Sequence, residues 1–436
     1  MNASIFLIGL ILFILINFHH KKTKQSLVLS PDQQQLLNLI ESRHQHMFIT
    51  GKAGSGKSTV LRQFRNSTKK KIVVVAPTAI AALNVEGQTI HSLFKFTFDV
   101  PPDNSNIDQA SVMLLRNLDV LIIDEISMVR ADLIDAIDRR LRSIRNSKLA
   151  FGGVQVVMFG DLYQLPPVVE SHQLRRYLNY KYGGIYFFNA KVWRKTTLHL
   201  YELEQVFRQT DNDFIEILNQ IREGNISPKL LAKLNQRVVK VPKNKPLIIL
   251  APTNKLVNEI NLKQLAKLTT KSYIYKAKPR NSSEDLTLKV GAQVMMTKND
   301  SQQRWVNGSL GEIKKLSKHS VKVKINQQVY KVNKQTWAKV DYLYNPKNQQ
   351  IKKTRTGYLK QYPIKLAWAV TIHKSQGQTF DNCLINLKDG VFSAGQAYVA
   401  LSRCKSLEGL YLGSVVMPSD INVDPKISQF MKSLKS

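Results

Sequence analysis

A glycine-rich run that contains a lysine carries the clearest chemistry in this sequence. Residues 51–59 read GKAGSGKST, follow an apolar run at residues 47–50 and open a helical pattern. In this Walker A context, backbone N–H groups face phosphates, Lys57 would lie against the β and γ phosphates, and the Ser58 hydroxyl would ligate magnesium. We therefore predict a site for ATP and Mg²⁺ formed by Gly51, Ala53, Gly54, Ser55, Gly56, Lys57, Ser58 and Thr59.

Two carboxylates follow a second apolar run, at residues 120–123. Asp124 and Glu125 should emerge at the sheet edge that carries the phosphate loop, because the carboxyl ends of parallel strands meet there. Asp124 would hold the water shell of Mg²⁺, and Glu125 would accept a proton from, or orient, the water that attacks the γ phosphate. Without the upstream loop such a pair would more often be a solvated strand end. Together the two motifs favour a Walker B site.

A third polar strand end reads GDLYQLPPV and follows an apolar run at residues 154–159. Gln164 lies in this segment and is held by the prolines after it, so its amide could sense the γ phosphate. A proline-rich turn is the simpler interpretation. Its position after a strand beside the predicted Walker B site favours the role coupled to nucleotide.

The elements that must position these residues alternate between short β-branched runs and amphipathic stretches, which is typical of parallel strands covered by helices. In a first lobe we predict strands at residues 47–50, 72–76, 120–123 and 154–159. A second set lies at residues 247–250, from 369 onward, at 383–386 and at 410–413. The sequence therefore predicts two α/β lobes.

Length and charge limit the class of protein. The 436 residues suffice for two or three packed units, and 43% hydrophobic content is that of a folded chain. The 64 Lys and Arg against 31 Asp and Glu leave a formal charge of +33, which indicates a polyanionic partner or an unusually basic solvated surface. The two cysteines, Cys383 and Cys404, support neither a disulfide framework nor a structural zinc. A reducing compartment fits best.

Between Thr270 and Lys360 the pattern changes to short alternating strands, such as residues 320–325 and 328–332, with no clear helical period. This pattern predicts a small β barrel inserted in the second lobe. Residues 271–360 hold 20 Lys and Arg against 5 Asp and Glu. The local excess favours a nucleic-acid track over a merely solvated surface, and it predicts binding that weakens steeply with salt.

The stretch from Ser4 to Phe18 is almost wholly apolar and is followed by His19, His20, Lys21 and Lys22. Its 15 residues are fewer than the roughly 20 that span a bilayer, and it lacks a basic start and a small-residue cleavage site. We weigh an uncleaved membrane anchor, which would leave the remainder of the chain on the cytoplasmic side, equally against an incidental extension.

The ordered blocks GKAGSGKST, APTAIAALNVEGQTIHSLF, DEISMV, FGGVQVVMFGDLYQLPPV, EQVFRQT, AVTIHKSQGQTF and QAYVALSRC resemble the PIF-type DNA helicases of superfamily I, subgroup B, which are related to RecD-like helicases. The resemblance runs from about Leu29 to Gly413. It implies an α/β fold with two RecA-like P-loop lobes and an SH3-like β-barrel insertion. The expected ranges are an extension at 1–26, a first lobe at 27–200, a second lobe at 201–270 and 361–436, and the insertion at 271–360.

The resemblance also implies roles for residues outside the first three motifs. Gln33 would recognise adenine, and Gln376 would contact the nucleotide and report closure of the lobes. Arg208 and Arg403 would reach the γ phosphate from the second lobe, where arginines stabilise charge that develops in the transition state. The predicted catalytic set is Lys57, Asp124, Glu125, Gln164, Arg208 and Arg403, with Ser58 and Asp124 at the metal.

Expected DNA contacts are strand-end hydroxyl, imidazole and ammonium groups that bind phosphates without reading bases. The family pattern places them at Pro77, Thr78, His91, Ser92, Thr371, His373 and Lys374. Aromatic residues at positions 94, 96 and 98 could stack on bases, but alternating aromatics more often mark a half-buried strand. In the insertion, Trp305, Asn307 and Gly308 fit the entry to the barrel.

The function implied is an ATP-dependent helicase that moves 5′ to 3′ on single-stranded DNA and acts in replication, recombination, repair or telomere and quadruplex maintenance. Expected partners are single-stranded DNA, forked or tailed duplex and G-quadruplex DNA. We expect the chain to act as a monomer. If it is anchored in a membrane, its remaining part would lie on the cytoplasmic, nuclear or viral side. The alternatives are a RecD-like or conjugative helicase subunit and a DNA-binding ATPase switch that does not unwind.

Overall fold

The structure is a computed structural model of the 436-residue chain. It describes residues 29–78, 81–82, 85–97, 107–169, 171–209, 211–240, 248–278, 285–298, 300–305, 309–325, 327–345, 350–376, 378–388 and 390–435, with backbone alone at 337–345, 350–357 and 359. The stretch from Ser4 to Phe18 lies outside these ranges. Within them, no helix combines the length and the apolar character needed to cross a bilayer.

The first lobe is built on a six-stranded sheet in the order β3-β2-β4-β5-β1-β6, in which every pairing is parallel. Its strands confirm the four predicted runs. They are β1 (His46–Gly51), β2 (Ile72–Ala76), β3 (Gln88–Thr89), β4 (Val120–Ile123), β5 (Gln155–Phe159) and β6 (Leu198–Leu203). β1, β4 and β5 are buried over nearly their whole length, as parallel strands covered on both faces require, whereas β6 at the edge of the sheet is mostly half-buried.

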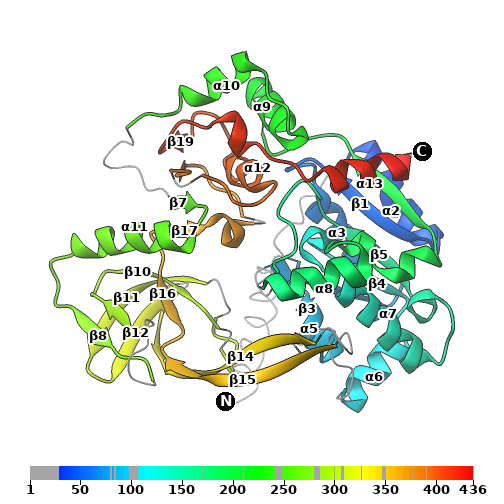
Figure 1. The fold of residues 1–436 in the computed structure, drawn as a ribbon, viewed down its shortest axis with the longest axis horizontal. Helices are drawn as coiled ribbons and strands as arrows, with labels where there is room; N and C mark the ends of the chain where they lie inside the picture. The colour runs from blue at the N-terminus through cyan, green and yellow to red at the C-terminus, as the bar shows by residue number, and fades with distance from the viewer. Residues whose placement is uncertain are drawn as a thin grey trace, which may run out of the picture.

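Helices cover both faces of this sheet (Figure 1). They are α2 (Pro31–Ser42), α3 (Lys57–Ser67), α5 (Ile90–Phe94), α6 (Gln109–Arg116), α7 (Ala131–Arg145) and α8 (His172–Tyr182). α7 shows why they pack, because Leu133, Ile134, Ile137 and Leu141 form one apolar stripe and are all buried. Single-turn helices in this lobe are η1 (Ile126–Met128), η2 (Ala150–Gly153), η3 (Phe187–Asn189) and η4 (Lys191–Arg194).

The second lobe contains a four-stranded parallel sheet in the order β17-β7-β18-β19. The strands are β7 (Ile248–Ala251), β17 (Ala369–Thr371), β18 (Cys383–Ile385) and β19 (Leu410–Leu412), close to the predicted positions. Leu247, predicted to begin the first of them, lies outside the described residues. The accompanying helices are α9 (Asn212–Glu223), α10 (Pro228–Asn235), α11 (Asn254–Ala266), α12 (Gln396–Leu401), η5 (Ile372–Ser375) and η6 (Pro418–Asp420).

The insertion contains a five-stranded antiparallel sheet in the order β13-β12-β11-β10-β16 and a smaller pair, β8 with β9. The strands are β8 (Tyr273–Tyr275), β9 (Leu286–Leu288), β10 (Gln293–Met296), β11 (Leu310–Ser317), β12 (Ser320–Ile325), β13 (Gln328–Val332) and β16 (Ile364–Leu366). The predicted strands at 320–325 and 328–332 are confirmed. Alternate residues of β12 are buried in a separate core, which explains their period of two.

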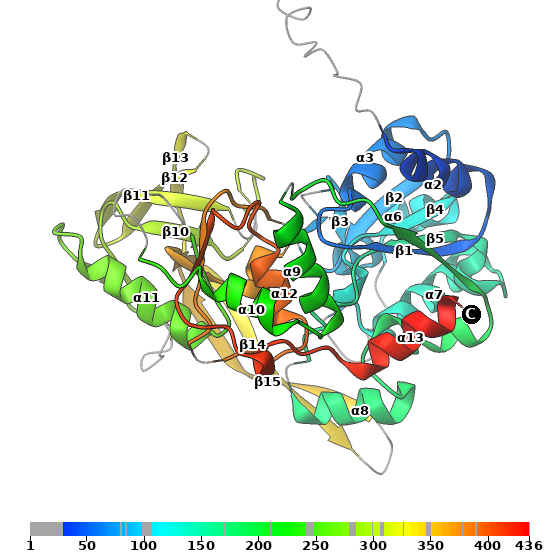
Figure 2. The same cartoon turned by 90° about the horizontal axis from the view of Figure 1, so that it is seen from above.

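Two further strands of the insertion leave this sheet and form a long hairpin. β14 (Gln335–Asn345) and β15 (Gln350–Gln361) pair only with each other in the described residues, with a register shift after Lys339. The hairpin extends across the molecule until β14 lies beside α8 of the first lobe (Figures 1 and 2). These residues were expected within a barrel, so the insertion reaches farther than its sequence pattern indicated.

The chain ends on the first lobe. α13 (Pro425–Lys435) lies beside the elements of the first lobe (Figure 2). It buries Ile427 and Met431 in the core of that lobe, and its Phe430 ring stacks on Phe188 with 4.1 Å between centroids. The expected division differs here, because residues 361–436 were assigned to the second lobe. The expected boundary at residue 200 also falls inside β6. Both differences arise because a sequence pattern shows that a helix or strand has an apolar face but not which lobe that face packs against.

Candidate functional site between the two lobes

The phosphate loop leaves the end of β1 and enters α3 through two glycines in the left-handed region. Gly54 has φ of +87° and Gly56, the residue before α3, has φ of +82°. A β carbon on Gly54 would lie 2.5 Å from Cβ of Arg208, and one on Gly56 would lie 2.4 Å from Nε2 of Gln33. Glycine is therefore required for its backbone and for the space it leaves. The loop is packed between α2 and the segment that carries Arg208.

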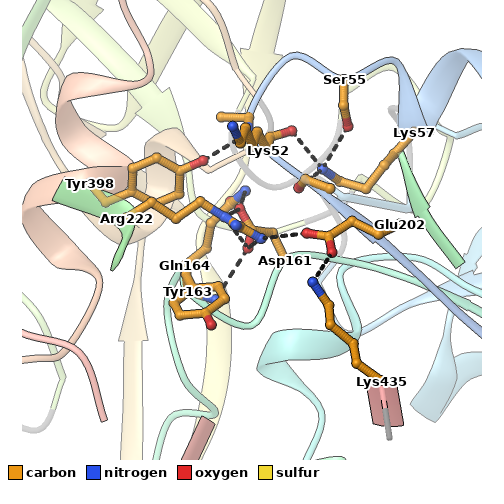
Figure 3. Close-up of polar contacts among 12 residues, drawn as sticks. Lys52, Ser55, Lys57, Asp161, Tyr163, Gln164, Glu202, Arg222, Tyr398 and Lys435 are labelled. Atoms are coloured by element: carbon orange, nitrogen blue, oxygen red, sulfur yellow. Dashed lines mark hydrogen bonds and ion pairs between the residues drawn. The ribbon is translucent and has the colours of Figure 1, made fainter. Parts of the chain in front are cut away.

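The ammonium group of Lys57 lies inside this loop. It donates hydrogen bonds to the carbonyl oxygens of Gly51 at 2.6 Å and Lys52 at 3.0 Å, and it lies 3.4 Å from Oγ of Ser55 (Figure 3). Burial lowers its pKa to about 8, although the nearby carboxylate of Asp161 favours the charged form. The surroundings therefore place a cation where the motif predicts a phosphate contact.

Gln33 lies against the same loop and is 3% exposed. Its side chain caps α2, because Oε1 accepts from the N–H of Ser30 at 3.2 Å, and its Nε2 group reaches the Ser55 carbonyl oxygen at 3.5 Å. This position beside Gly56 is compatible with adenine recognition. That role stays a prediction.

The Walker B carboxylates emerge after β4, beside the phosphate loop. Asp124 is 8% exposed, and burial together with the neighbouring Glu125 carboxylate raises its pKa to about 7. Glu125 has φ of +52°, a strained conformation for a residue with a side chain. Its Oε2 accepts a hydrogen bond of 2.9 Å from Nε2 of Gln376, which belongs to the second lobe. Gln376 thus joins the predicted hydrolytic carboxylate to the opposite lobe.

The residues present fit a magnesium ion shared with a nucleotide. Ser58, in the first turn of α3, is exposed, and Asp124 is the buried carboxylate of the adjacent strand end. Among the described residues no group of three or more His, Cys, Asp or Glu could hold a metal alone. Mg²⁺ accepts such a site, because one or two protein oxygens, waters and substrate phosphates complete its octahedron.

The two predicted arginines also lie at this interface. Arg208 follows β6, and its Nη1 donates to the Ser402 carbonyl oxygen at 3.2 Å, while the N–H of Phe207 donates to the carbonyl of Gly54 at 2.9 Å. Arg403 is 2% exposed. Its guanidinium donates to the carbonyl oxygens of Val399 at 3.0 Å and Gln378 at 3.2 Å and to Oγ of Ser402 at 3.0 Å. Burial, followed by the charge of Arg208, lowers the pKa of Arg403 to about 10.

Three residues at the interface were not predicted as functional. Asp161 begins the segment that carries Gln164, Arg222 comes from α9, and the Tyr398 hydroxyl from α12 accepts from the N–H of Ala53 at 2.8 Å (Figure 3). Asp161 stands in a motif that the sequence displays, so its type and place were visible. The only signal for Arg222 was a charge on the apolar face of α9, which otherwise buries Phe214, Ile217, Leu218 and Ile221.

The predicted DNA contacts lie at two strand ends and in two short helices. Pro77 and Thr78 follow β2, His91 and Ser92 lie in α5, and Thr371, His373 and Lys374 lie at the end of β17 and in η5. Burial lowers the pKa of His91 to about 4 and also lowers that of His373, so both rings are neutral at pH 7. The Thr78 hydroxyl accepts from the N–H of Ala81, a local turn contact.

The aromatic residues near this edge do not all suit base stacking. Phe94 and Phe96 are 0% and 6% exposed and stack on each other, and Phe94 ends a helix rather than lying on a strand. Phe98 lies outside the described residues. The side chain of Phe392 is 65% exposed instead, and its ring stacks on His373 with 5.9 Å between centroids and 10° between planes. No sequence motif had singled it out.

In the insertion, Trp305 is 6% exposed and belongs to the core of that domain, with the Arg304 guanidinium 4.6 Å from its ring centroid. It therefore stabilises the insertion more directly than it could contact a strand. Asn307 and Gly308, expected beside it, lie outside the described residues.

The phosphate loop and the Walker B carboxylates lie on one parallel lobe, and Arg208 packs against the loop after the last strand of that lobe. Arg403 and Gln376 of the second lobe lie at the same interface, so the fold and site define a two-lobed P-loop ATPase of the helicase class. Comparison with known proteins agrees. The family model described as PIF1-like helicase matches residues 28–230. The chain belongs to the PIF1 family of ATP-dependent DNA helicases.

Individual relatives extend this match to nearly the whole chain. The ATP-dependent DNA helicase Pif1 of Bdellovibrio bacteriovorus is 33% identical over 427 residues, covering 93% of this chain and 92% of that protein. Longer animal and fungal relatives are spanned over 62% to 69% of their length. The crystal structure of Bacteroides Pif1 bound to ssDNA has 38% identity and a TM-score of 0.83, covering 94% of this chain and 98% of that one. A structure of two coordinating Pif1 helicases unwinding forked dsDNA gives 38% identity, a TM-score of 0.82 and the same coverage.

Proposed function

We propose that this chain uses ATP hydrolysis between its two lobes to move 5′ to 3′ along single-stranded DNA and to unwind forked or tailed duplex. The observation that carries the proposal is the hydrogen bond between Glu125 of the first lobe and Gln376 of the second, at 2.9 Å. Glu125 would orient the attacking water, and this hydrogen bond makes the position of its carboxylate depend on where the second lobe lies. Turnover and lobe movement are then two parts of one cycle.

Each predicted residue has a defined part in this cycle. Backbone N–H groups of residues 53–59 and Lys57 would hold the phosphates, and Ser58 and Asp124 would hold Mg²⁺, which neutralises developing charge when bound. Glu125 would orient the water and accept its proton, and Gln164 would contact the γ phosphate. Arg208 and Arg403 would stabilise the transition state when the lobes are closed. Loss of the γ phosphate removes what both lobes bind, and the cleft can open.

The strand would run along the edges formed by Thr78 and His91 in the first lobe and by Thr371 and His373 in the second. Phe392 supports this path, because an exposed aromatic ring stacked on a histidine offers a further flat face to a base. The segment is tied to the nucleotide interface. The N–H of Phe392 donates to Oε1 of Gln396 at 3.1 Å, at the start of the helix that leads to Arg403.

The antiparallel insertion would be the SH3-like barrel of the family and a second DNA track. Its strand register supports binding to a polyanion. Lys315 pairs with Lys322, and Lys322 pairs with Lys331, so three lysines occupy directly opposed positions on β11, β12 and β13. All three are exposed. Like charges directly opposite one another destabilise a sheet, and phosphates lying along the row would relieve that repulsion.

Several expectations stay predictions. They are action on G-quadruplex DNA, action as a monomer, the pathway in replication, recombination, repair or telomere maintenance, and a membrane contact through Ser4 to Phe18. The two coordinating helicases in the forked-DNA structure belong to a relative.

The test is strand separation with duplexes that carry a single-stranded tail on the 5′ or the 3′ side, with ATP and Mg²⁺. We expect unwinding from the 5′ tail. Lys57→Ala should abolish unwinding and ATP turnover and leave binding to single-stranded DNA in place. Preference for the 3′ tail would refute the proposed direction. DNA-stimulated ATP hydrolysis without unwinding would instead identify a subunit that needs partners, and hydrolysis indifferent to DNA would identify a switch.

A further inference from the structure

A buried ion pair joins the two lobes beside the phosphate loop. Asp161, after β5 of the first lobe, is 1% exposed, and Arg222, in the last turn of α9, is 4% exposed. Nη2 and Nε of Arg222 each lie 3.2 Å from Oδ1 of Asp161 (Figure 3). Burial alone would raise the pKa of Asp161, but the charges of Arg222 and Lys57 outweigh burial and hold that pKa below its ordinary value. Both partners are therefore ionised at pH 7.

The pair is connected to the predicted phosphate sensor. Oδ2 of Asp161 accepts a hydrogen bond of 3.3 Å from Nε2 of Gln164, and Oδ1 accepts one of 3.2 Å from the N–H of Tyr163. The guanidinium of Arg222 also lies 4.4 Å from the centroid of the Tyr163 ring. One carboxylate thus fixes both the backbone and the side-chain amide of the segment. The orientation of Gln164 depends on Asp161, and the place of Asp161 depends on Arg222.

Arg222 is carried by an element of the second lobe. α9 packs its apolar residues into the core that also contains β7, β18 and α12, so Arg222 moves with that core. The same core includes Ala53 and Leu165 of the first lobe, one on the phosphate loop and one directly after Gln164. Any displacement of α9 relative to the first sheet must therefore act on the segment that carries Gln164.

The energetics argue that stability alone does not account for the pair. Desolvation makes a buried ion pair a weak source of stability, and well-packed apolar residues of similar volume often serve as well or better. An apolar pair could not orient the amide of Gln164 or set a charge near Lys57. The Asp161 carboxylate accepts hydrogen bonds from both lobes at once. An apolar replacement would lose these bonds.

We propose that Arg222 is a positioning residue that makes the orientation of Gln164, through Asp161, depend on docking of α9 against the first lobe. Gln164 is then oriented for hydrolysis only when the second lobe is docked against the first. This rests on the ATP-hydrolysing part of the proposed function and not on unwinding or its direction. Arg222 itself contacts neither nucleotide nor DNA in this account.

The experiment compares Arg222→Gln, Arg222→Lys and Asp161→Asn in the full chain by DNA-stimulated ATP hydrolysis. We expect kcat to fall about 10-fold to 100-fold in Arg222→Gln and Asp161→Asn, the size of effect that misplacement of an orienting group produces. KM for ATP and the Kd for single-stranded DNA should change by less than about threefold, because Arg222 binds neither. Arg222→Lys keeps the buried charge and should recover part of kcat.

A double-mutant cycle separates positioning from folding. Asp161→Asn with Arg222→Gln should cost no more in kcat than the worse single variant, because both act through one contact. Arg237→Gln is the control, since Arg237, which follows α10, is a structural arginine of the second lobe that donates to the backbone carbonyls of Glu408 and Leu410 and not to the segment that carries Gln164. It should lower the thermal midpoint without lowering kcat.

Unchanged kcat in a folded Arg222→Gln variant would overturn the inference, as would additive losses in the double variant. A rise in KM with kcat retained would also overturn it, because that would make Arg222 a nucleotide-binding group. These outcomes are distinct from failure of the proposed function, which would show in the unsubstituted chain as ATP hydrolysis without DNA stimulation or strand separation.

Discussion

The interface between the lobes and the basic sheet of the insertion are built on opposite principles. At the interface, Asp161, Arg222 and Arg403 are almost fully buried, and each has several specific partners. On the insertion, Lys315, Lys322 and Lys331 are exposed and repel one another in a row. ATP chemistry in this chain thus depends on fixed geometry, whereas DNA binding would depend on accumulated charge. Small changes should therefore be costly in the first region and graded in the second.

The largest expected effect is on Arg403. Arg403→Lys keeps a positive charge but loses the planar fork that donates to Val399, Gln378 and Ser402, so we expect kcat of ATP hydrolysis to fall about 10³-fold or more. Steady-state ATPase assays with saturating single-stranded DNA measure this. Lys405→Gln is the control, because the neighbouring Lys405 is half exposed and pairs with Asp381 at the surface. If kcat fell by less than about tenfold in Arg403→Lys, ATP hydrolysis would not depend on fixed geometry at the interface in the way we propose.

The second prediction concerns the lysine row. Lys315→Gln, Lys322→Gln and Lys331→Gln combined should flatten the plot of log K for single-stranded DNA against log salt by about 2, since each phosphate contact contributes roughly 0.7. The same variant should be more stable to urea at low salt, because the cross-strand repulsion is gone. Fluorescence anisotropy and urea titration measure the two quantities. An unchanged salt slope would place the DNA elsewhere.

The third prediction concerns Phe392. Phe392→Leu keeps an apolar side chain but removes the aromatic face, so the Kd for single-stranded DNA should rise about fivefold, equivalent to roughly 1 kcal/mol for one stacked base. ATP hydrolysis without DNA should not change. Exposed Tyr180 on α8 offers a matched control as Tyr180→Leu, which should leave the Kd unaltered. Equal losses in both variants would remove Phe392 from the proposed path.

The smallest effect on turnover is expected at His46, at the opposite end of β1 from the phosphate loop. Its Nδ1 accepts from the N–H of Val156 at 3.1 Å, and burial, with a smaller contribution from His199, lowers its pKa to about 4. Between about pH 4 and the ordinary pKa of about 6.5, the unfolded chain binds a proton that the folded chain does not. Stability from this group is therefore complete above that range and lost as the pH falls through it.

Urea unfolding of the original chain and of His46→Asn at several pH values measures this contribution. The asparagine retains an acceptor but does not titrate, so the original chain should lose about 2 kcal/mol more than the variant as the pH falls from 7 to 4.5. Activity at pH 7 should be equal. A constant difference in free energy of unfolding across pH would contradict the assignment of a neutral, half-buried ring.

Local patterns predicted those parts of the fold that local physics determines. The β-branched runs that became β2, β4 and β12 have the predicted bounds, because buried parallel strands and half-buried antiparallel strands leave clear periods in sequence. The phosphate loop and the Walker B carboxylates were found for a similar reason. Their chemistry requires particular residue types at short spacing, on strands whose carboxyl ends must meet.

Long-range packing leaves no comparable pattern in the sequence. β14 and β15 alternate like the other strands of the insertion, yet they pair outside its sheet and reach α8, because register and partner are chosen by surfaces far away in sequence. α13 carries an ordinary amphipathic pattern that does not reveal which lobe it completes. Phe392 was not singled out because exposure is a property of the folded chain.

The sequence by itself was enough to predict that this chain binds and hydrolyses ATP on a parallel α/β scaffold, because residues 47–59, 120–125 and 154–168 each contain both a strand and the chemistry at its end. Only the tertiary structure decided that Arg222 meets Asp161 and that Gln376 meets Glu125. Those pairs are separated by 61 and 251 residues. Polar groups so distant in sequence become partners only after two hydrophobic cores have formed and brought their edges together.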